Sequence, residues 1–138
     1  MLKILVKSLL TKAIILAGGD YVGSFNAGNL VYKANSSNDE AQKLRWLYLV
    51  RHSRLLFSCE MKKETLDGND IKRLCSGGDP LTARVHGGLE TSFVPHCLIT
   101  VFANDLPKIE PYDEAVCIRS NVVSYNKCFV DVVKNKEI

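Results

Sequence analysis

Two polar residues of this chain each follow directly on an apolar segment, and both could act on a phosphate group. Glu60 comes soon after Leu55-Leu56-Phe57, and Asn104 closes the segment from Cys97 to Ala103. Short apolar runs of this kind predict buried strands, and open α/β sheets bind ligands at the carboxyl edge of their strands. A carboxylate at that edge can hold Mg²⁺ or orient a water, and an amide there can lie beside a phosphate. The alternatives are a loop glutamate without a role and a turn-forming asparagine before Asp105.

A loose group of basic residues surrounds a glycine turn later in the chain. Lys72 and Arg73 precede Gly77-Gly78-Asp79-Pro80, and Arg84 and His86 follow it. Basic side chains on flexible segments suit contact with the phosphate backbone of a nucleic acid. Ordinary solvated surface charge is the alternative. We therefore treat these four side chains as candidates for nucleic-acid binding.

The composition is ordinary for a single soluble domain over residues 1–138. Hydrophobic residues make up 46% of the chain and charged residues 24%, with a formal net charge of +3. The length is sufficient for one hydrophobic core, and the mild basicity permits a nucleic-acid partner without requiring one. Five cysteines occur without any C-x-x-C spacing. This pattern argues against a disulfide framework and a zinc ribbon, and it favours reduced thiols inside a cell.

Residues 1–17 predict an amphipathic helix that ends at two glycines. Lys3 and Lys7 lie on one face, whereas Leu9 and Leu16 fall elsewhere, where we expect them to pack. The lysines leave no uncharged run long enough to cross a membrane or to form a good secretory core. We therefore expect a chain that is neither inserted in a membrane nor secreted. A targeting segment is the alternative.

Short apolar segments alternate with helical patterns along the chain, which predicts an α/β fold with a mainly parallel sheet flanked by helices. We expect strands within residues 20–31, 54–58, 96–103 and 115–123, and an extended segment or hairpin over 81–89. Further helices are expected over residues 69–74 and from a capping box at Ser37 and Glu40 through Leu47. Loops are expected over 61–68 and 105–113, and a frayed tail at 134–138.

Several segments, each weak alone, occur in an order that resembles the superfamily 3 helicases of viruses and phages. They are Gly19-Asp20-Tyr21-Val22-Gly23, the strand before Glu60, Ile71-Lys72-Arg73-Leu74, Gly77 to Arg84, and Asn104 with Leu106-Pro107. The resemblance runs over roughly residues 7–125, and the primase-helicase branch of poxviruses and giant viruses is the most similar.

This resemblance implies an AAA+ core that hydrolyses ATP with Mg²⁺ and unwinds DNA in viral replication as a hexameric ring of identical chains. Primase or other replication proteins would be partners, in the cytoplasm or a viral factory. By position, Glu60 matches the Walker B acid, which also contacts Mg²⁺, and Asn104 matches the sensor. Arg84 lies in the segment that the family associates with DNA. Arg119 matches an arginine that would reach a neighbour's nucleotide, with a salt-bridged strand residue as the alternative.

The resemblance breaks down at the phosphate-binding loop, whose pattern is G-x-x-x-x-G-K-[ST]. Lys7 and Ser8 fall where its last two residues belong, which makes them nominal contacts for phosphate and Mg²⁺. The glycine positions hold Met1 and Val6, and a β-branched residue suits such a loop poorly. We therefore expect an AAA+ core lacking its first strand, with residues 1–17 in place of the Walker A helix. Two hypotheses follow: a helicase ATPase core, or an inactive copy that serves in oligomerisation or DNA binding.

Overall fold

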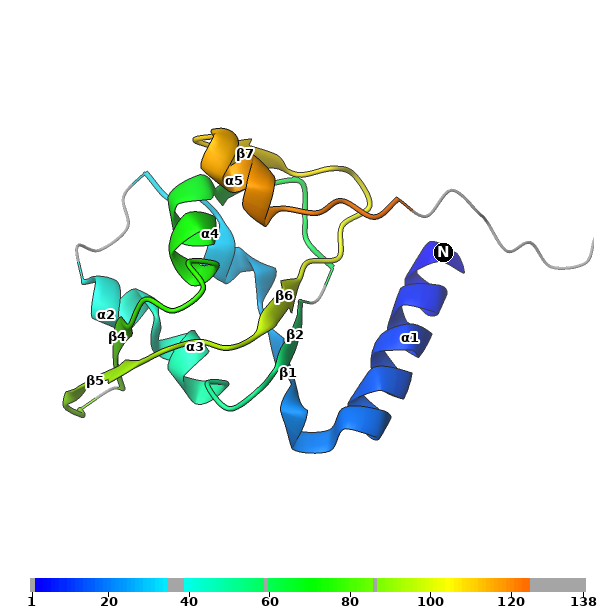
Figure 1. The fold of residues 1–138 in the computed structure, drawn as a ribbon. Coiled ribbons are helices and arrows are strands. Elements are labelled where there is room, and N and C mark those ends of the chain that lie inside the picture. Colours follow the sequence, from blue (N-terminus) through cyan, green and yellow to red (C-terminus); the bar gives the residue numbers. More distant parts are fainter. Residues whose placement is uncertain (1, 35–38, 59, 86, 125–138) are drawn as a thin grey trace, which may run out of the picture.

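A three-stranded parallel sheet forms the centre of the molecule. The computed structural model describes residues 2–34, 39–58, 60–85 and 87–124, with the backbone alone for residues 2–8. The sheet contains β1 (Val22–Phe25), β2 (Leu55–Ser58) and β6 (Leu98–Thr100) in the order β1-β2-β6 (Figure 1). Because all three strands run parallel, their carboxyl ends meet at one edge. Helices flank the sheet, so the predicted α/β class is confirmed.

The central strand, β2, is the most buried of the three. Leu56, Phe57 and Ser58 are all buried, and Leu56 has no exposed surface. Leu56 pairs in register with Gly23 of β1 and Ile99 of β6. A strand covered on both faces has no polar face, which explains the continuous apolar run in the sequence. Burial of the Leu56 side chain contributes about 1.5–3 kcal/mol relative to exposure.

Beyond the sheet, the segments that follow β2 and β6 continue side by side. Met61 and Ala103 form a parallel bridge, and the Met61 N–H donates to the Phe102 carbonyl over 2.8 Å. Farther along, β3 (Thr65–Asp67) pairs in parallel with β7 (Lys108–Glu110). The two segments therefore hold each other in place at the carboxyl edge of the sheet.

The strands β3 and β7 are a correction to the sequence-based prediction, which placed only loops over residues 61–68 and 105–113. Each strand is three residues long, and together they contain Lys, Glu and Asp. Each segment contains a single apolar residue between two polar ones, which is too short to show a periodic pattern, so nothing in the sequence distinguishes it from a loop. They are strands because their backbones pair with each other.

The first helix, α1 (Leu2–Gly18), runs alongside the sheet in the direction opposite to β1. Gly19 has a positive φ of 51°, and η1 (Gly19–Tyr21) turns the chain from the helix into the strand. The N-terminal end of α1 consequently lies at the same end of the molecule as the carboxyl ends of the strands (Figure 1). The helix and its glycine end were predicted correctly. The packing of Leu9 and Leu16 was not, because these side chains are 68% and 86% exposed.

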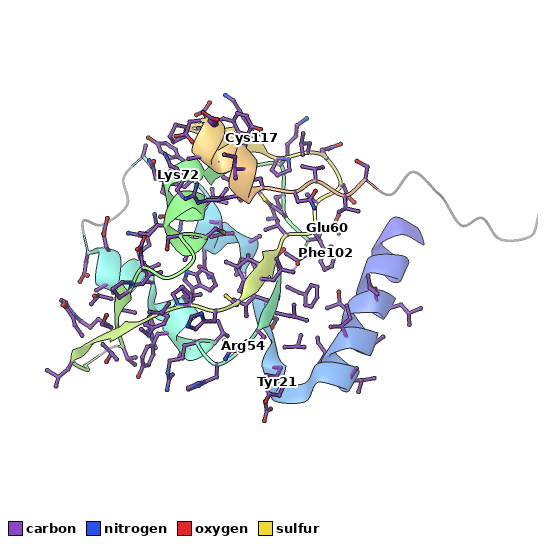
Figure 2. All side chains as sticks on the ribbon, viewed as in Figure 1. Tyr21, Arg54, Glu60, Lys72, Phe102 and Cys117 are labelled. Atoms are coloured by element: carbon purple, nitrogen blue, oxygen red, sulfur yellow. The ribbon has the colours of Figure 1, made fainter. Side chains whose placement is uncertain are left out.

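Three short helices contribute to the core: α2 (Glu40–Lys43), α3 (Arg45–Leu49) and α4 (Gly68–Leu74). Buried leucines in or next to them, Leu44, Leu47 and Leu74, join one hydrophobic cluster with Leu56. Figure 2 shows side chains filling the space between the sheet and the helices. The core thus connects the sheet to the helices and to the hairpin described below.

The start of α2 differs from the prediction. The Asp39 side chain caps the helix by accepting from the Gln42 N–H over 3.1 Å. The capping residue expected from the sequence, Ser37, lies outside the described residues. The single helix expected through Leu47 is two helices, because Leu44 leaves the helical conformation between them. Asp39 satisfies an N–H that the first turn of a helix leaves without a partner.

The last described element, α5 (Glu114–Arg119), is a helix, and the strand predicted over residues 115–123 is wrong. Asp113 caps this helix by accepting from the Val116 N–H over 3.0 Å. Val116 is fully buried, whereas Ile118 is 75% exposed. A run of apolar residues alone does not separate a helix with one buried residue per turn from a strand. The predicted tail at 134–138 lies outside the described residues.

Strands β4 (Leu81–Arg84) and β5 (Glu90–Phe93) form an antiparallel hairpin. The sequence predicted an extended segment or a hairpin over residues 81–89, so the hairpin alternative is correct but its second strand lies beyond the predicted range. Leu81 pairs with Phe93, and Arg84 pairs with Glu90. Burial alternates along β4, with Leu81 and Ala83 inside. The hairpin extends to the opposite side of the molecule from α1 (Figure 1).

Candidate functional site

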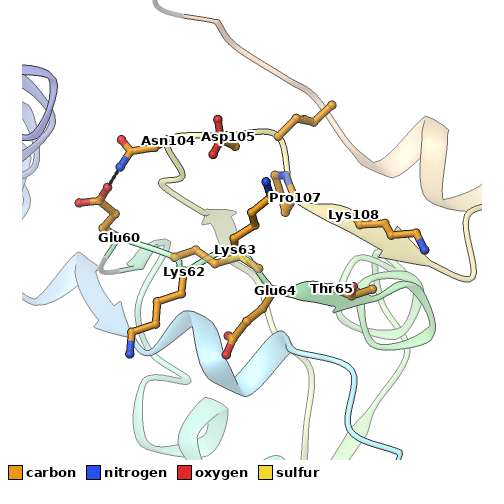
Figure 3. Close-up of a pocket in the computed structure, with 11 residues that line it drawn as sticks. Glu60, Lys62, Lys63, Glu64, Thr65, Asn104, Asp105, Pro107 and Lys108 are labelled. Carbon is orange, nitrogen blue, oxygen red and sulfur yellow. Dashed lines mark hydrogen bonds between the residues drawn. The ribbon is translucent and has the colours of Figure 1, made fainter.

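The fold brings Glu60 and Asn104 together although 44 residues separate them. The Asn104 Nδ2 donates a hydrogen bond to the Glu60 Oε1 (Figure 3). Each residue follows one of two neighbouring parallel strands, β2 and β6, at their carboxyl ends. The structure therefore places both side chains at the sheet edge where the sequence analysis expected them, and their chemical roles remain predictions.

Contacts below the two side chains fix the alignment of their segments. The buried Ser58 hydroxyl accepts from the Phe102 N–H over 3.1 Å, and the Phe57 and Phe102 rings stack at 5.8 Å. These contacts join the end of β2 to the segment after β6. Sequence reasoning missed the positioning role of Ser58, and a serine that ends an apolar strand would have been the signal for it.

The two side chains lie on a cavity of about 620 Å³ between the paired segments. Residues 60–65 line one side of this cavity and residues 104–108 the other. The lining carries three basic and three acidic side chains: Lys62, Lys63, Lys108, Glu60, Glu64 and Asp105. We call this region the edge cavity. Its balanced charge suits a ligand that carries both a cation and an anion.

The edge cavity suits Mg²⁺ only if the ion arrives with ligands of its own. Within the described residues, no group of three or more His, Cys, Asp or Glu side chains could hold a metal. Proteins often hold Mg²⁺ through one or two carboxylates, with phosphate oxygens and waters completing the shell. Glu60 and Asp105, which both line the cavity, meet that smaller requirement.

The nominal phosphate contacts Lys7 and Ser8 lie inside α1, which is helical from Leu2 onward. Their side chains fall outside the described part of the structure. The positions of the expected phosphate loop that the structure describes are therefore helix, up to and including Val6.

The predicted nucleic-acid contacts are divided between α4 and β4, and each described one already has acidic partners. Lys72 pairs with Asp113 at 2.7 Å. Arg73 pairs with Glu40 at 2.9 Å and with Asp70 at 3.2 Å. Arg84 pairs with Asp39 and Glu90, and its hydrogen bond to Glu90 is the main cause that raises its pKa. His86 lies outside the described residues.

Around α4, charged side chains form a partly buried cluster that we call the α4 network: Lys43, Asp67, Asp70, Arg73 and Glu40. Asp70 is buried, with 9% of its side chain exposed, and lies 2.6 Å from the Lys43 ammonium. Asp67 caps α4 by accepting from the Asn69 N–H over 2.9 Å. The network fixes α2 against α4 and leaves little of Asp70 to solvent.

Arg119 ends α5 and does not lie on a strand, which corrects the placement expected for it. Its Nε donates to the Cys75 carbonyl over 3.3 Å, and its Nη1 donates to the Ala115 carbonyl over 3.0 Å. Arg119 is not among the residues that line the edge cavity. Within this chain, the arginine therefore ties α5 to the end of α4.

The described cysteines Cys75, Cys97 and Cys117 are free thiols. Burial is the main cause that raises the pKa of both Cys75 and Cys97. Because the thiolate is the nucleophilic form, these two groups are poorly suited to attack at neutral pH.

Among the described residues, none of the helices has the length and apolar character needed to span a bilayer.

Comparison with known proteins finds a similar protein from a virophage. Over 133 residues the chain is 41% identical to the protein named "Putative helicase V13" of Sputnik virophage. The match covers 96% of this chain and 17% of that protein's length. The similarity supports a helicase-like viral family. No family model matches the chain.

Proposed function

We propose that this chain is part of the ATPase core of a superfamily 3 viral DNA helicase, with a P-loop-like AAA+ sheet. The observation that carries the proposal is the contact between Glu60 and Asn104 at the carboxyl ends of neighbouring parallel strands. The similarity to a virophage protein named as a helicase supports the same assignment. The reaction would be attack of water on the γ-phosphate of ATP, coupled to DNA unwinding.

In this proposal, Glu60 orients the attacking water and accepts its proton, and Asn104 positions the Glu60 carboxylate. As the sensor residue, Asn104 would lie beside the γ-phosphate. Mg²⁺ bound with the nucleotide near Glu60 would neutralise part of the phosphate charge. Lys7 and Ser8 remain nominal contacts to the same nucleotide.

The β4–β5 hairpin and the end of α4 would carry the DNA contacts. Arg84 lies on β4, and Leu89 next to the hairpin turn is 91% exposed. Because Lys72, Arg73 and Arg84 already pair with carboxylates, DNA would have to exchange those carboxylates for phosphates. Assembly into a hexameric ring, with Arg119 reaching a neighbour's nucleotide and primase as a further partner, belongs to the same proposal.

One observation favours a second candidate function. α1 is helical from Leu2, over positions where a glycine loop would curl its N–H groups around phosphate. A chain without that loop could serve in oligomerisation or DNA binding and hydrolyse no ATP. The exposed apolar side chains of α1, Leu9 and Leu16, would suit contact with another protein surface.

Binding and hydrolysis of Mg-ATP by the purified chain test the first proposal against the second. We expect wild-type chain and Glu60→Gln to bind Mg-ATP with similar affinity in calorimetry. Hydrolysis by Glu60→Gln should fall about 10²- to 10⁴-fold, the range for loss of a general base. Glu64→Gln is the matched control, because Glu64 lines the same cavity but points away from Glu60 (Figure 3). A folded chain that binds no Mg-ATP would support the second candidate.

A further inference from the structure

We propose that Lys63 binds the terminal phosphates of the nucleotide in the edge cavity. No motif in the sequence marks this residue, and it belongs to the segment that follows β2. The inference rests on the proposed function, because it names the cation that the Glu60 and Asn104 site uses. It also places the phosphate-binding cation on the sheet edge itself, on a different element from Lys7.

The direction of the side chains distinguishes Lys63 from its neighbour. The Lys63 ammonium points across the edge cavity toward Pro107, whereas the Lys62 ammonium points away from that side (Figure 3). The chain bends at Lys63, where the Glu64 N–H donates to the Lys62 carbonyl over 2.8 Å, and this turn separates the directions of the two side chains. Glu64 also points away from Lys63 in this view (Figure 3). Only one of the two neighbouring lysines therefore faces the segment that carries Asn104.

Lys63 has no acidic partner among the described residues, so its ammonium is available to a ligand. Among the described residues, no carboxylate lies within ion-pair distance of Lys63, whereas Lys43 and Lys72 each have one at 2.6–2.7 Å. Lys108, on the other side of the cavity, pairs with Glu110. A phosphate can therefore gain a charge-assisted hydrogen bond from Lys63 without displacing a partner.

The acidic side chains of the lining determine which form of phosphate fits. Glu60 and Asp105 line the cavity with Lys63, so a bare polyphosphate would meet two carboxylates as well as the ammonium. A magnesium ion on the polyphosphate reverses the sign of those two contacts, because carboxylates are ligands for Mg²⁺. We therefore expect binding of the Mg²⁺ complex and much weaker binding of the same polyphosphate in EDTA.

Calorimetric titration of the full chain with Mg-tripolyphosphate and with Mg-ATP tests the assignment. Lys63→Gln should weaken binding of both probes about 10- to 100-fold, the loss expected for one hydrogen bond to a charged group. Lys62→Gln removes the same charge one residue away and should weaken binding much less than Lys63→Gln, because the Lys62 ammonium points away from the segment that carries Asn104 (Figure 3). Urea unfolding of each variant checks that the fold is retained.

Each remaining outcome decides for or against Lys63. Equal losses in Lys62→Gln and Lys63→Gln would overturn the inference, as would no loss in Lys63→Gln or no binding of Mg-tripolyphosphate by wild type. Lys63-dependent binding of Mg-tripolyphosphate without binding of Mg-ATP would support the phosphate site while the ATPase proposal fails. A single-stranded oligonucleotide is the last probe. If Lys63→Gln weakens its binding and leaves Mg-tripolyphosphate unchanged, the phosphate comes from nucleic acid and the assignment to a nucleotide is overturned.

Discussion

The edge cavity and the α4 network both concentrate charged side chains, but they use them differently. In the α4 network, Asp70 is buried and contacts two cations, Lys43 and Arg73. In the edge cavity, the side chains are mostly exposed, and Lys63 contacts no carboxylate among the described residues. The charges of the network are therefore compensated inside the molecule, whereas the cavity retains charge that a ligand can compensate.

This difference separates residues that hold the fold from residues that can bind. Removing one member of a buried ion pair leaves a charge without compensation, which is costly. Removing an exposed charge costs little stability, because water replaces its partner. Substitutions in the network should consequently change unfolding, and substitutions at the cavity should change binding.

The largest expected effect on stability is that of Asp70→Asn. We expect it to lower the free energy of unfolding by about 2–4 kcal/mol, because Lys43 and Arg73 lose a buried partner. Urea unfolding followed by circular dichroism measures the change. The control is Asp105→Asn at the edge cavity, which should leave unfolding almost unchanged. Similar losses in the two variants would remove the distinction between the regions.

A smaller effect on stability, with a distinct effect on binding, is expected for Arg84→Gln. Arg84 is exposed, and its pairs with Asp39 and Glu90 lie at the surface, so the unfolding midpoint should hardly move. If the hairpin contacts DNA, affinity for a single-stranded oligonucleotide should fall, and the salt dependence should lose a slope of about one. Fluorescence anisotropy at several salt concentrations measures both.

Arg45→Gln is the matched control for that experiment, since Arg45 is an exposed arginine on α3. It lowers the net charge by the same amount at a site outside the hairpin. Equal losses of DNA affinity in Arg84→Gln and Arg45→Gln would show that net charge alone attracts the oligonucleotide, and Arg84 would then have no particular role.

The smallest effect should appear in the pH dependence of stability. The hydrogen bond from Lys72, followed by that from the Val116 N–H, lowers the pKa of Asp113. A carboxyl group with a lowered pKa stabilises the folded state above its ordinary pKa of about 3.9. That contribution is lost as the pH falls through the lower, folded value.

The variant Asp113→Asn isolates this contribution, because asparagine is also a good helix cap and retains the start of α5. Wild type and variant should differ in urea midpoint at pH 5, and the difference should shrink below pH 4 as Asp113 becomes protonated. A constant difference down to the lowest accessible pH would show that the ion pair with Lys72 contributes nothing to stability.

Sequence reasoning worked best where local pattern and tertiary environment agree. The apolar run of β2, the glycine end of α1 and the first strand of the hairpin were predicted, because each has a local signal of its own. The strand predicted over residues 115–123 failed because its apolar residues belong to α5, of which Val116 alone is buried. Burial depends on what packs nearby, and sequence periodicity over six residues does not reveal it.

The candidate site was predictable in part. Glu60 and Asn104 could be named because each follows an apolar strand, but their hydrogen bond depends on β2 and β6 being neighbours. The sequence did not reveal that the basic residues proposed to bind nucleic acid are paired with carboxylates, since residues such as Arg84 and Asp39 are 45 positions apart. Lys63 carried no signal either, because the direction of a side chain in a loop depends on pairing farther along the chain.

The sequence by itself determined the α/β class, most of the elements and the two polar residues that end the strands. These features follow from hydrophobic pattern, glycine turns and strand ends, which act over a few residues. Only the tertiary structure decided which charges are compensated and which remain available to a ligand. The physical reason is that ion pairs and cavities form between segments distant in sequence, and their energies depend on burial and distance, which the order of residues does not specify.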